Sequence, residues 1–247
     1  MNRIKLIDIS IVTILFLGII TLPINNWIKD VKTYYLTMSV ICLLYLVFLF
    51  LYIHIHPYMK ANSYRFSLRP LLILLPTFIV VISNYLYAWI INEHTVIYFP
   101  NYGYLQLIFI ALAVIIEEIL FRYLILSFLR PMGAFKAIIY SSLLFALFHL
   151  SHYFSSFNPV DLIKVIYSFG LGVILGALYY YSHSLIPSIV LHLSFNVLND
   201  YLFTGLYNVN HQFWYYFINA SLGIIVAIYL ILIYIFVLKK EDEKAEY

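Results

Sequence analysis

Long apolar runs separated by short polar breaks dominate the sequence. Each run holds roughly the 17–25 residues that an α-helix needs to cross the hydrocarbon of a bilayer. The breaks contain Pro, Gly, Asn or charged residues, as in Pro131-Met132-Gly133. The pattern predicts eight membrane-spanning helices, at about 5–24, 33–55, 69–91, 104–129, 135–151, 161–181, 185–203 and 213–238.

Composition supports this interpretation. The chain has 247 residues, of which 64% are hydrophobic and 10% charged, whereas soluble domains carry about 25% charged residues. A β-barrel is disfavoured because the apolar runs are continuous rather than alternating. The single cysteine, Cys42, excludes an intramolecular disulfide and a multi-cysteine metal site. We therefore expect an all-α, polytopic helical bundle that forms one integral membrane domain over residues 1–247.

The basic residues predict the orientation in the membrane, because cytoplasmic loops are enriched in Lys and Arg. With eight spans both termini share one side, and three basic residues fall on the other side: Lys29, Lys32 and Lys164. Ten share the side of the termini: Arg3, Lys5, Lys60, Arg65, Arg69, Arg130, Lys136, Lys239, Lys240 and Lys244. We therefore expect a multi-pass protein of the cell membrane with both ends in the cytoplasm. No basic cluster suggests nucleic-acid binding.

The predicted span 104–129 contains three ionisable side chains, Glu117, Glu118 and Arg122. An ionised group at the centre of a bilayer costs roughly 2.5–3.5 kcal/mol on insertion scales, so such residues indicate a paired or functional site. Glu118 and Arg122 are four residues apart and share one helix face, which predicts an ion pair. Glu117 lies about 100° away around the helix, so its partner must come from another helix.

Two later spans supply side chains that can meet Glu117. Phe145 and His149 are four residues apart on one span. His192 and Asn196 are four residues apart on another. Each pair therefore lies on one face of its helix. Because polar groups within a membrane face one another rather than lipid, we expect Glu117 and these two faces to form one site.

This set of side chains matches the needs of peptide hydrolysis. A buried carboxylate, here Glu117, can act as general base towards water, and a histidine can share or relay the proton. A second histidine and an asparagine can donate to the oxyanion of a tetrahedral intermediate. The sequence has no His-Glu-x-x-His zinc motif and no Gly-x-Ser-x-Gly elbow.

Three motifs in this order resemble those of the CAAX-protease and bacteriocin-processing family, also called the CPBP or Abi family. They are Glu117-Glu118-x-x-x-Arg122, Phe145-x-x-x-His149 and His192-x-x-x-Asn196. The resemblance covers about residues 108–200 and extends to the glycines and the Ser-Leu-Ile-Pro-Ser stretch before the last motif.

The resemblance implies an intramembrane endopeptidase with an eight-helix core, whose catalytic part here is about 104–203. Its substrate is expected to be a peptide or a membrane-associated protein, and bacteriocin immunity is among the roles of bacterial members. It further implies three groups of residues: Glu117 and His149 activating water, His192 and Asn196 holding the oxyanion, and Glu118, Arg122 and Phe145 as supporting residues.

Other interpretations remain open at this point. We expect no cofactor, and a zinc ion held by the two histidines and Glu117 is the alternative. Buried Glu, His and Arg also serve proton-coupled transporters, although the sequence shows no inverted repeat of the kind that transporters use. A non-catalytic membrane protein, acting in immunity or interaction, is the third possibility.

Overall fold

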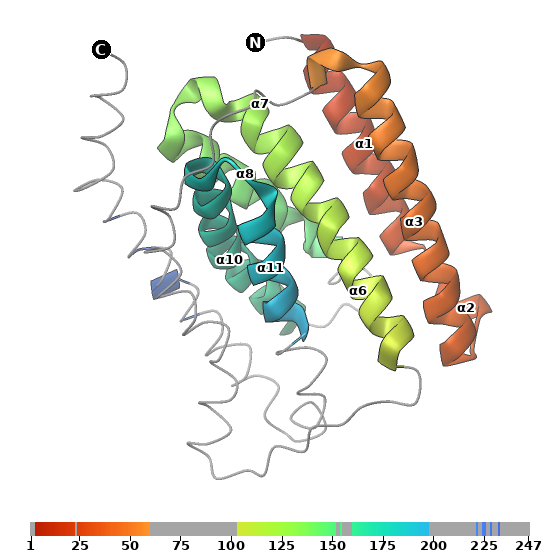
Figure 1. Cartoon of the computed structure of the whole chain (residues 1–247). Helices are drawn as coiled ribbons and strands as arrows, with labels where there is room; N and C mark the ends of the chain where they lie inside the picture. The colour runs from red at the N-terminus through yellow and green to blue at the C-terminus, as the bar shows by residue number, and fades with distance from the viewer. Residues whose placement is uncertain are drawn as a thin grey trace.

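Every element of the described part of the chain is a helix. The computed structural model describes residues 3–22, 24–59, 103–151, 154, 160–197 and the single positions 221, 224, 225, 228 and 232. Figure 1 shows their course from α1 to α11. The elements are α1 (Arg3–Thr21), α2 (Ile24–Trp27), α3 (Val31–Ile55), η1 (Pro57–Met59), α6 (Gly103–Glu118), η2 (Ile119–Leu126), α7 (Ser127–Leu129), η3 (Arg130–Met132), α8 (Ala134–Phe148), α10 (Val160–Ser182) and α11 (Leu185–Asn196). The helical membrane bundle expected from the sequence is confirmed.

Four helices in the described residues are long and apolar enough to cross a membrane: Ile4–Thr21, Val31–Ile55, Gly103–Met132 and Lys164–Ser182. The third runs continuously through α6, η2, α7 and η3. α8 and α11 are apolar but shorter. Together these helices correspond to six of the eight predicted spans. The predicted span 69–91 and nearly all of 213–238 lie outside the described residues, so the count of eight stays a prediction.

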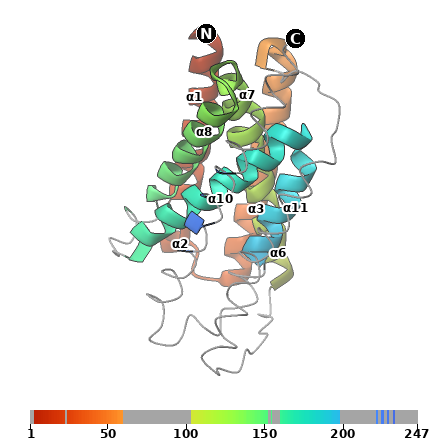
Figure 2. The same cartoon turned by 90° about the vertical axis from the view of Figure 1, so that its left-hand side faces the viewer.

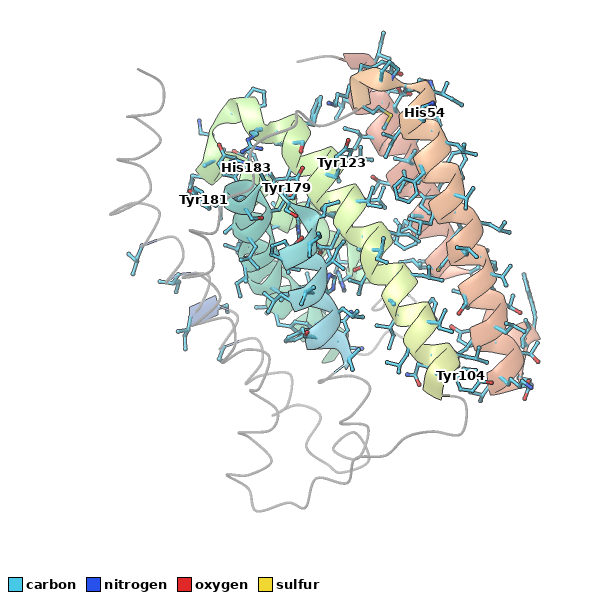
Figure 3. All side chains as sticks on the ribbon, viewed as in Figure 1. His54, Tyr104, Tyr123, Tyr179, Tyr181 and His183 are labelled. Atoms are coloured by element: carbon cyan, nitrogen blue, oxygen red, sulfur yellow. The ribbon has the colours of Figure 1, made fainter. Side chains whose placement is uncertain are left out.

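The helices run up and down, so positions far apart in the chain share an end of the bundle. α1 begins at the end where α3 finishes and where α6 leads into α7 (Figure 1). Figure 3 shows His54, Tyr179 and His183 towards this end, and Tyr104, at the start of α6, at the opposite end. We call the first of these the N-terminal end of the bundle.

Basic side chains divide between the two ends. Lys5, Arg130 and Lys136 lie on elements that meet at the N-terminal end. At the opposite end, Lys29 lies between α2 and α3, Lys32 lies at the start of α3, and Lys164 lies near the start of α10. In the described helices the basic residues are thus divided between the two ends of the bundle, in the groups that the predicted orientation requires. Which end faces the cytoplasm stays a prediction.

Two apolar clusters hold the bundle together. The first lies between α1, α3, η2 and the end of α8. In it, the Phe16 ring stacks on Tyr45 and on Phe148, with centroids 5.3 and 5.7 Å apart. The Tyr45 hydroxyl donates to the carbonyl of Val12 and so joins α3 to α1. The second cluster joins α8, α10 and α11.

The packing of α8 against α10 depends on two glycines. A Cβ on Gly172 would lie 3.1 Å from the Cβ of Ser142 and 3.2 Å from Cδ1 of Phe145. A Cβ on Gly176 would lie 3.3 Å from Cγ2 of Ile138. Small residues at such positions let two helix backbones approach closely. Gly172 thus allows α10 to pack directly behind Phe145.

The span Gly103–Met132 changes its helical geometry halfway. Directly after Glu118 the chain enters η2, which is π-helical, and the amide of Ser127 donates to the carbonyl of Arg122, five residues earlier. The hydroxyl of Ser141, on α8, donates to the carbonyl of Phe121 at 2.7 Å. π-helical segments are rare and occur frequently at functional sites. Here the π-helical geometry begins at Ile119, directly after Glu117 and Glu118.

Candidate functional site

The candidate residues come from four neighbouring elements of the bundle. Glu117 and Glu118 are the last two residues of α6, and Arg122 lies on η2. Phe145 and His149 lie on α8 and at its C-cap, and His192 and Asn196 lie on α11. α11 packs against α6, and α8 packs against η2. The fold therefore brings the three sequence motifs to one region.

A hydrogen bond joins the second carboxylate to the second histidine. Nδ1 of His192 lies 2.9 Å from Oε1 of Glu118, and both side chains are buried. A carboxylate oxygen accepts, so Nδ1 of His192 is the donor in this bond. The assignment of the hydrogen follows from this partner. Glu118 thereby fixes the orientation of the His192 ring.

The other nitrogen of the same ring faces the first carboxylate. Nε2 of His192 lies 3.7 Å from Oε2 of Glu117, too far for a hydrogen bond but within reach of an ion pair. The side chain of Glu117 is 15% exposed, whereas that of Glu118 is 0% exposed. The imidazole thus lies between two carboxylates, of which only Glu117 is partly accessible.

Arg122 forms the ion pair that the spacing predicts. Its Nε lies 3.3 Å from Oε2 of Glu118, and both side chains are fully buried. The contact lacks the geometry of a hydrogen bond, so its attraction is chiefly between charges. The guanidinium carbon lies 4.8 Å from the centroid of the Phe145 ring, where a cation–π contact is expected. Arg122 and His192 therefore reach Glu118 through different oxygens.

The Phe145 ring contacts both histidines and Arg122. Its centroid lies 4.7 Å from that of His149 and 5.7 Å from that of His192, with both imidazoles nearly edge-on. The Phe121 ring contacts it from η2 at 5.1 Å. Because one aromatic ring touches both imidazoles and Arg122, a displacement of Phe145 would move all three.

A hydrogen bond within its own helix fixes the orientation of the His149 ring. Its Nδ1 lies 2.9 Å from the carbonyl oxygen of Phe145. A carbonyl only accepts, so Nδ1 carries the hydrogen and Nε2 of the neutral ring is an acceptor. The ion pair of Glu117 runs to His192 rather than to His149. The joint action of Glu117 and His149 on water therefore stays a prediction.

Asn196 is the last residue of α11, one turn beyond His192 on the same face. In the described part of the chain, the hydrogen bonds of the cluster do not include it. The same residues contain no group of three or more His, Cys, Asp or Glu side chains arranged to hold a metal ion.

Sequence reasoning missed one supporting residue, Ser141. Its hydroxyl bonds the Phe121 carbonyl and is buried. The available signal was its spacing, because Ser141, Phe145 and His149 recur every four residues and share one helix face. The hydroxyl bonds a carbonyl of the π-helical segment, and no sequence motif predicts that segment.

One comparison with known proteins covers the stretch that contains this cluster. Residues 99–198 match the family model described as type II CAAX prenyl endopeptidase Rce1-like. The matched stretch contains all three motifs and the cluster around His192. No curated protein and no solved structure matches the chain.

Proposed function

We propose that this chain, whose residues 99–198 match the Rce1-like family model, is an intramembrane endopeptidase that uses a glutamate to activate water. The observation that carries the proposal is the position of His192, whose ring nitrogens lie 2.9 Å from Glu118 and 3.7 Å from Glu117. The substrate is a peptide bond of a membrane-associated peptide or protein.

In this proposal Glu117 is the general base. Its carboxylate is the accessible member of the pair, and it takes a proton from water as the water oxygen attacks the carbonyl carbon of the peptide. The same proton then passes to the leaving amide nitrogen as the carbon–nitrogen bond breaks. His149 has an accepting Nε2, because its Nδ1 hydrogen is used by the Phe145 carbonyl, and it orients the water.

His192 and Asn196 hold the developing oxyanion. The Nδ1 hydrogen of His192 is directed to Glu118, so the ring can donate from Nε2 only when it carries both hydrogens. Two carboxylates flank the ring, Glu118 at Nδ1 and Glu117 at Nε2. Glu118 is thus a positioning residue, and Arg122 supports it by neutralising its charge.

A comparison of variants tests the activity. Membrane peptides from cells with the wild-type chain should include cleavage products that disappear in Glu117→Gln, which keeps the size of the side chain. Ser194→Ala, on α11 between His192 and Asn196, is the matched control and should retain the products. Identical peptides in all three strains at equal protein abundance would exclude the protease. If the protein is a proton-coupled transporter, Glu117→Gln should instead alter the uptake of a solute. If it is a non-catalytic immunity protein, Glu117→Gln should leave the protection of the cell intact.

A second experiment tests whether a metal takes part. A catalytic zinc usually has three protein ligands and an open position. We expect the purified protein to cleave its substrate after exhaustive chelation and to hold no stoichiometric zinc. Activity that disappears on chelation and returns with zinc would replace the glutamate mechanism, while the residues of the site would remain the same.

A further inference from the structure

An apolar groove of 420 Å³ runs along the bundle beside α1, and its lining includes Phe121 and Phe148, whose rings contact Phe145 and His149. It is bounded by α1, by the stretch 121–129 and by the second half of α8. Figure 2 shows α1 beside α8 and α7 near the N-terminal end. Leu6 and Ile14 on α1, and Leu147 on α8, line it and are 42%, 65% and 46% exposed. The groove therefore opens sideways, where membrane-spanning helices meet lipid.

The groove offers no hydrogen-bond donor along its α1 wall. Its two hydroxyl groups belong to Ser10 and Thr13. They donate to the carbonyls of Leu6 and Ile9, on their own helix, at 2.9 and 2.8 Å. An extended peptide lying here would find no donor for its carbonyl oxygens on this wall, and unpaired backbone groups are costly in hydrocarbon. An alkyl chain needs no such partners, so the wall suits a lipid chain.

The length of the groove matches one leaflet. Its wall on α1 extends from Leu6 to Leu17, about 16 Å at the rise of an α-helix. Half of a hydrocarbon core of about 30 Å is about 15 Å. The groove begins one turn inside the N-terminal end of the bundle, so an acyl chain entering there would be covered along most of its depth.

A positive charge lies at the mouth. Lys5 precedes Leu6 and lies one turn from Ile9, which also lines the groove. The acidic residue nearest to it, Asp8, is directed to α3 and η1, where it accepts hydrogen bonds from the hydroxyls of Tyr52 and Tyr58. Lys5 therefore adds a positive charge beside this end of the groove.

We propose that this groove binds one acyl chain of an anionic phospholipid, with the lipid phosphate beside Lys5. The acyl chain of the lipid makes the apolar contacts with the groove. Lys5 favours an anionic headgroup, because a lysine near the membrane surface attracts anionic lipid. The proposal requires only a membrane-spanning bundle and does not depend on the proteolytic activity.

Photo-crosslinking in vesicles tests the site. A photoreactive amino acid replaces either Leu147 or Leu143 in the full chain. Both leucines lie on α8 and are 46% exposed, but only Leu147 lines the groove. The protein is reconstituted in equal parts of phosphatidylglycerol and phosphatidylcholine, and the lipid adducts are identified by mass spectrometry. Leu144, equally exposed and also lining the groove, provides a second groove position.

At the groove positions the ratio of phosphatidylglycerol to phosphatidylcholine adducts should exceed that at position 143 about five-fold, as expected for one lysine. Lys5→Gln should reduce this ratio to that of position 143, whereas Lys29→Gln, at the opposite end, should leave it unchanged. Equal ratios at all positions, an absence of lipid adducts in the groove, or adducts to a second copy of the chain would each overturn the proposal.

Discussion

The Phe145 ring stands edge-on to the His192 imidazole, with their centroids 5.7 Å apart and their planes at 85°. Phe145 is also the side chain that α10 contacts through Gly172. The ring that contacts this candidate catalytic histidine thus packs in turn against Gly172 of α10. This relationship gives the first testable prediction.

Gly172→Ala should lower activity. The new Cβ would lie 3.2 Å from Phe145 Cδ1 and 3.1 Å from Ser142 Cβ, and overpacking of this kind costs about 1–3 kcal/mol. Gly18→Ala is the control, because no atom lies within 4 Å of the added Cβ. Cleavage rates and thermal midpoints in detergent measure both effects. Equal behaviour of the two variants would contradict the role of the close contact.

Arg122→Ala should lower the abundance of the protein. The substitution removes the cation that pairs with the buried Glu118 on the same helix. Removing one partner of a buried ion pair lowers the free energy of unfolding by about 3–5 kcal/mol. The double variant Arg122→Ala/Glu118→Ala removes both charges and should recover part of that loss. Thermal stability of the purified variants is the measurement. A single variant with normal abundance and normal stability would show that the ion pair is dispensable.

Two adjacent serines give a matched pair for the π-helical segment. The hydroxyl of Ser141 bonds the Phe121 carbonyl of η2, whereas that of Ser142 bonds the Ile138 carbonyl of its own helix, both at 2.7 Å. Ser141→Ala should therefore destabilise the protein by about 1–3 kcal/mol, the cost of an unsatisfied buried group. Ser142→Ala should cost less, because the Ile138 carbonyl that loses the hydroxyl still accepts a backbone hydrogen bond within α8. Equal losses would show that the contact between helices contributes nothing specific.

Arg130 and His183 form a contact at the N-terminal end of the bundle. Nη2 of Arg130 lies 3.1 Å from the carbonyl of Tyr180 and 3.0 Å from Nδ1 of His183. The guanidinium only donates, so Nδ1 of His183 accepts. Burial, and secondly the charge of Arg130, hold the pKa of His183 below its ordinary value of 6.5.

This contact predicts a loss of stability in acid. A lowered pKa means that the fold prefers the neutral ring, so the contribution is complete above about pH 6.5 and declines as the pH falls below it. His183→Asn keeps an acceptor and tolerates the positive φ of 57° at this position. Thermal midpoints between pH 8 and pH 5 should fall more for the wild type than for this variant. Parallel curves would contradict the prediction.

The orientation in the membrane can be tested at two exposed positions. In a Cys42→Ser background, Met132→Cys marks the N-terminal end and Lys29→Cys the opposite end. If the termini are cytoplasmic, a membrane-impermeant maleimide added to intact cells should label position 29 and reach position 132 only after lysis. Labelling of both positions in intact cells would contradict the predicted arrangement.

The sequence predicts much of this architecture. Continuous apolar runs locate the helices, because the bilayer fixes their length. The spacing of Glu118 and Arg122 predicts their ion pair, since it depends only on the turn of one helix. The motifs also predict that Glu117, His149 and His192 lie in one region of the fold.

What the sequence leaves open is the choice of partners across helices. Glu117 and Glu118 differ only by about 100° of rotation, so the pattern cannot tell which of them receives His192. That choice depends on how α11 packs on α6, which is a tertiary property. The structure gives the hydrogen bond of His192 to Glu118 and the longer contact to Glu117.

The π-helical segment also has a genetic consequence. Its hydrogen bonds reach five residues back rather than four, so the segment holds about one residue more than an α-helix with the same number of turns. Removing one codon from 119–126 and restoring α-helical bonds would therefore keep Glu117 and Glu118 roughly in register with the part of the span beyond them. Removing one codon from an α-helical part of a span would instead turn its two sides by about 100° relative to each other. Single-codon deletions between Ile119 and Leu126 should therefore be more frequent among functional variants than single-codon deletions in the α-helical parts of the described spans.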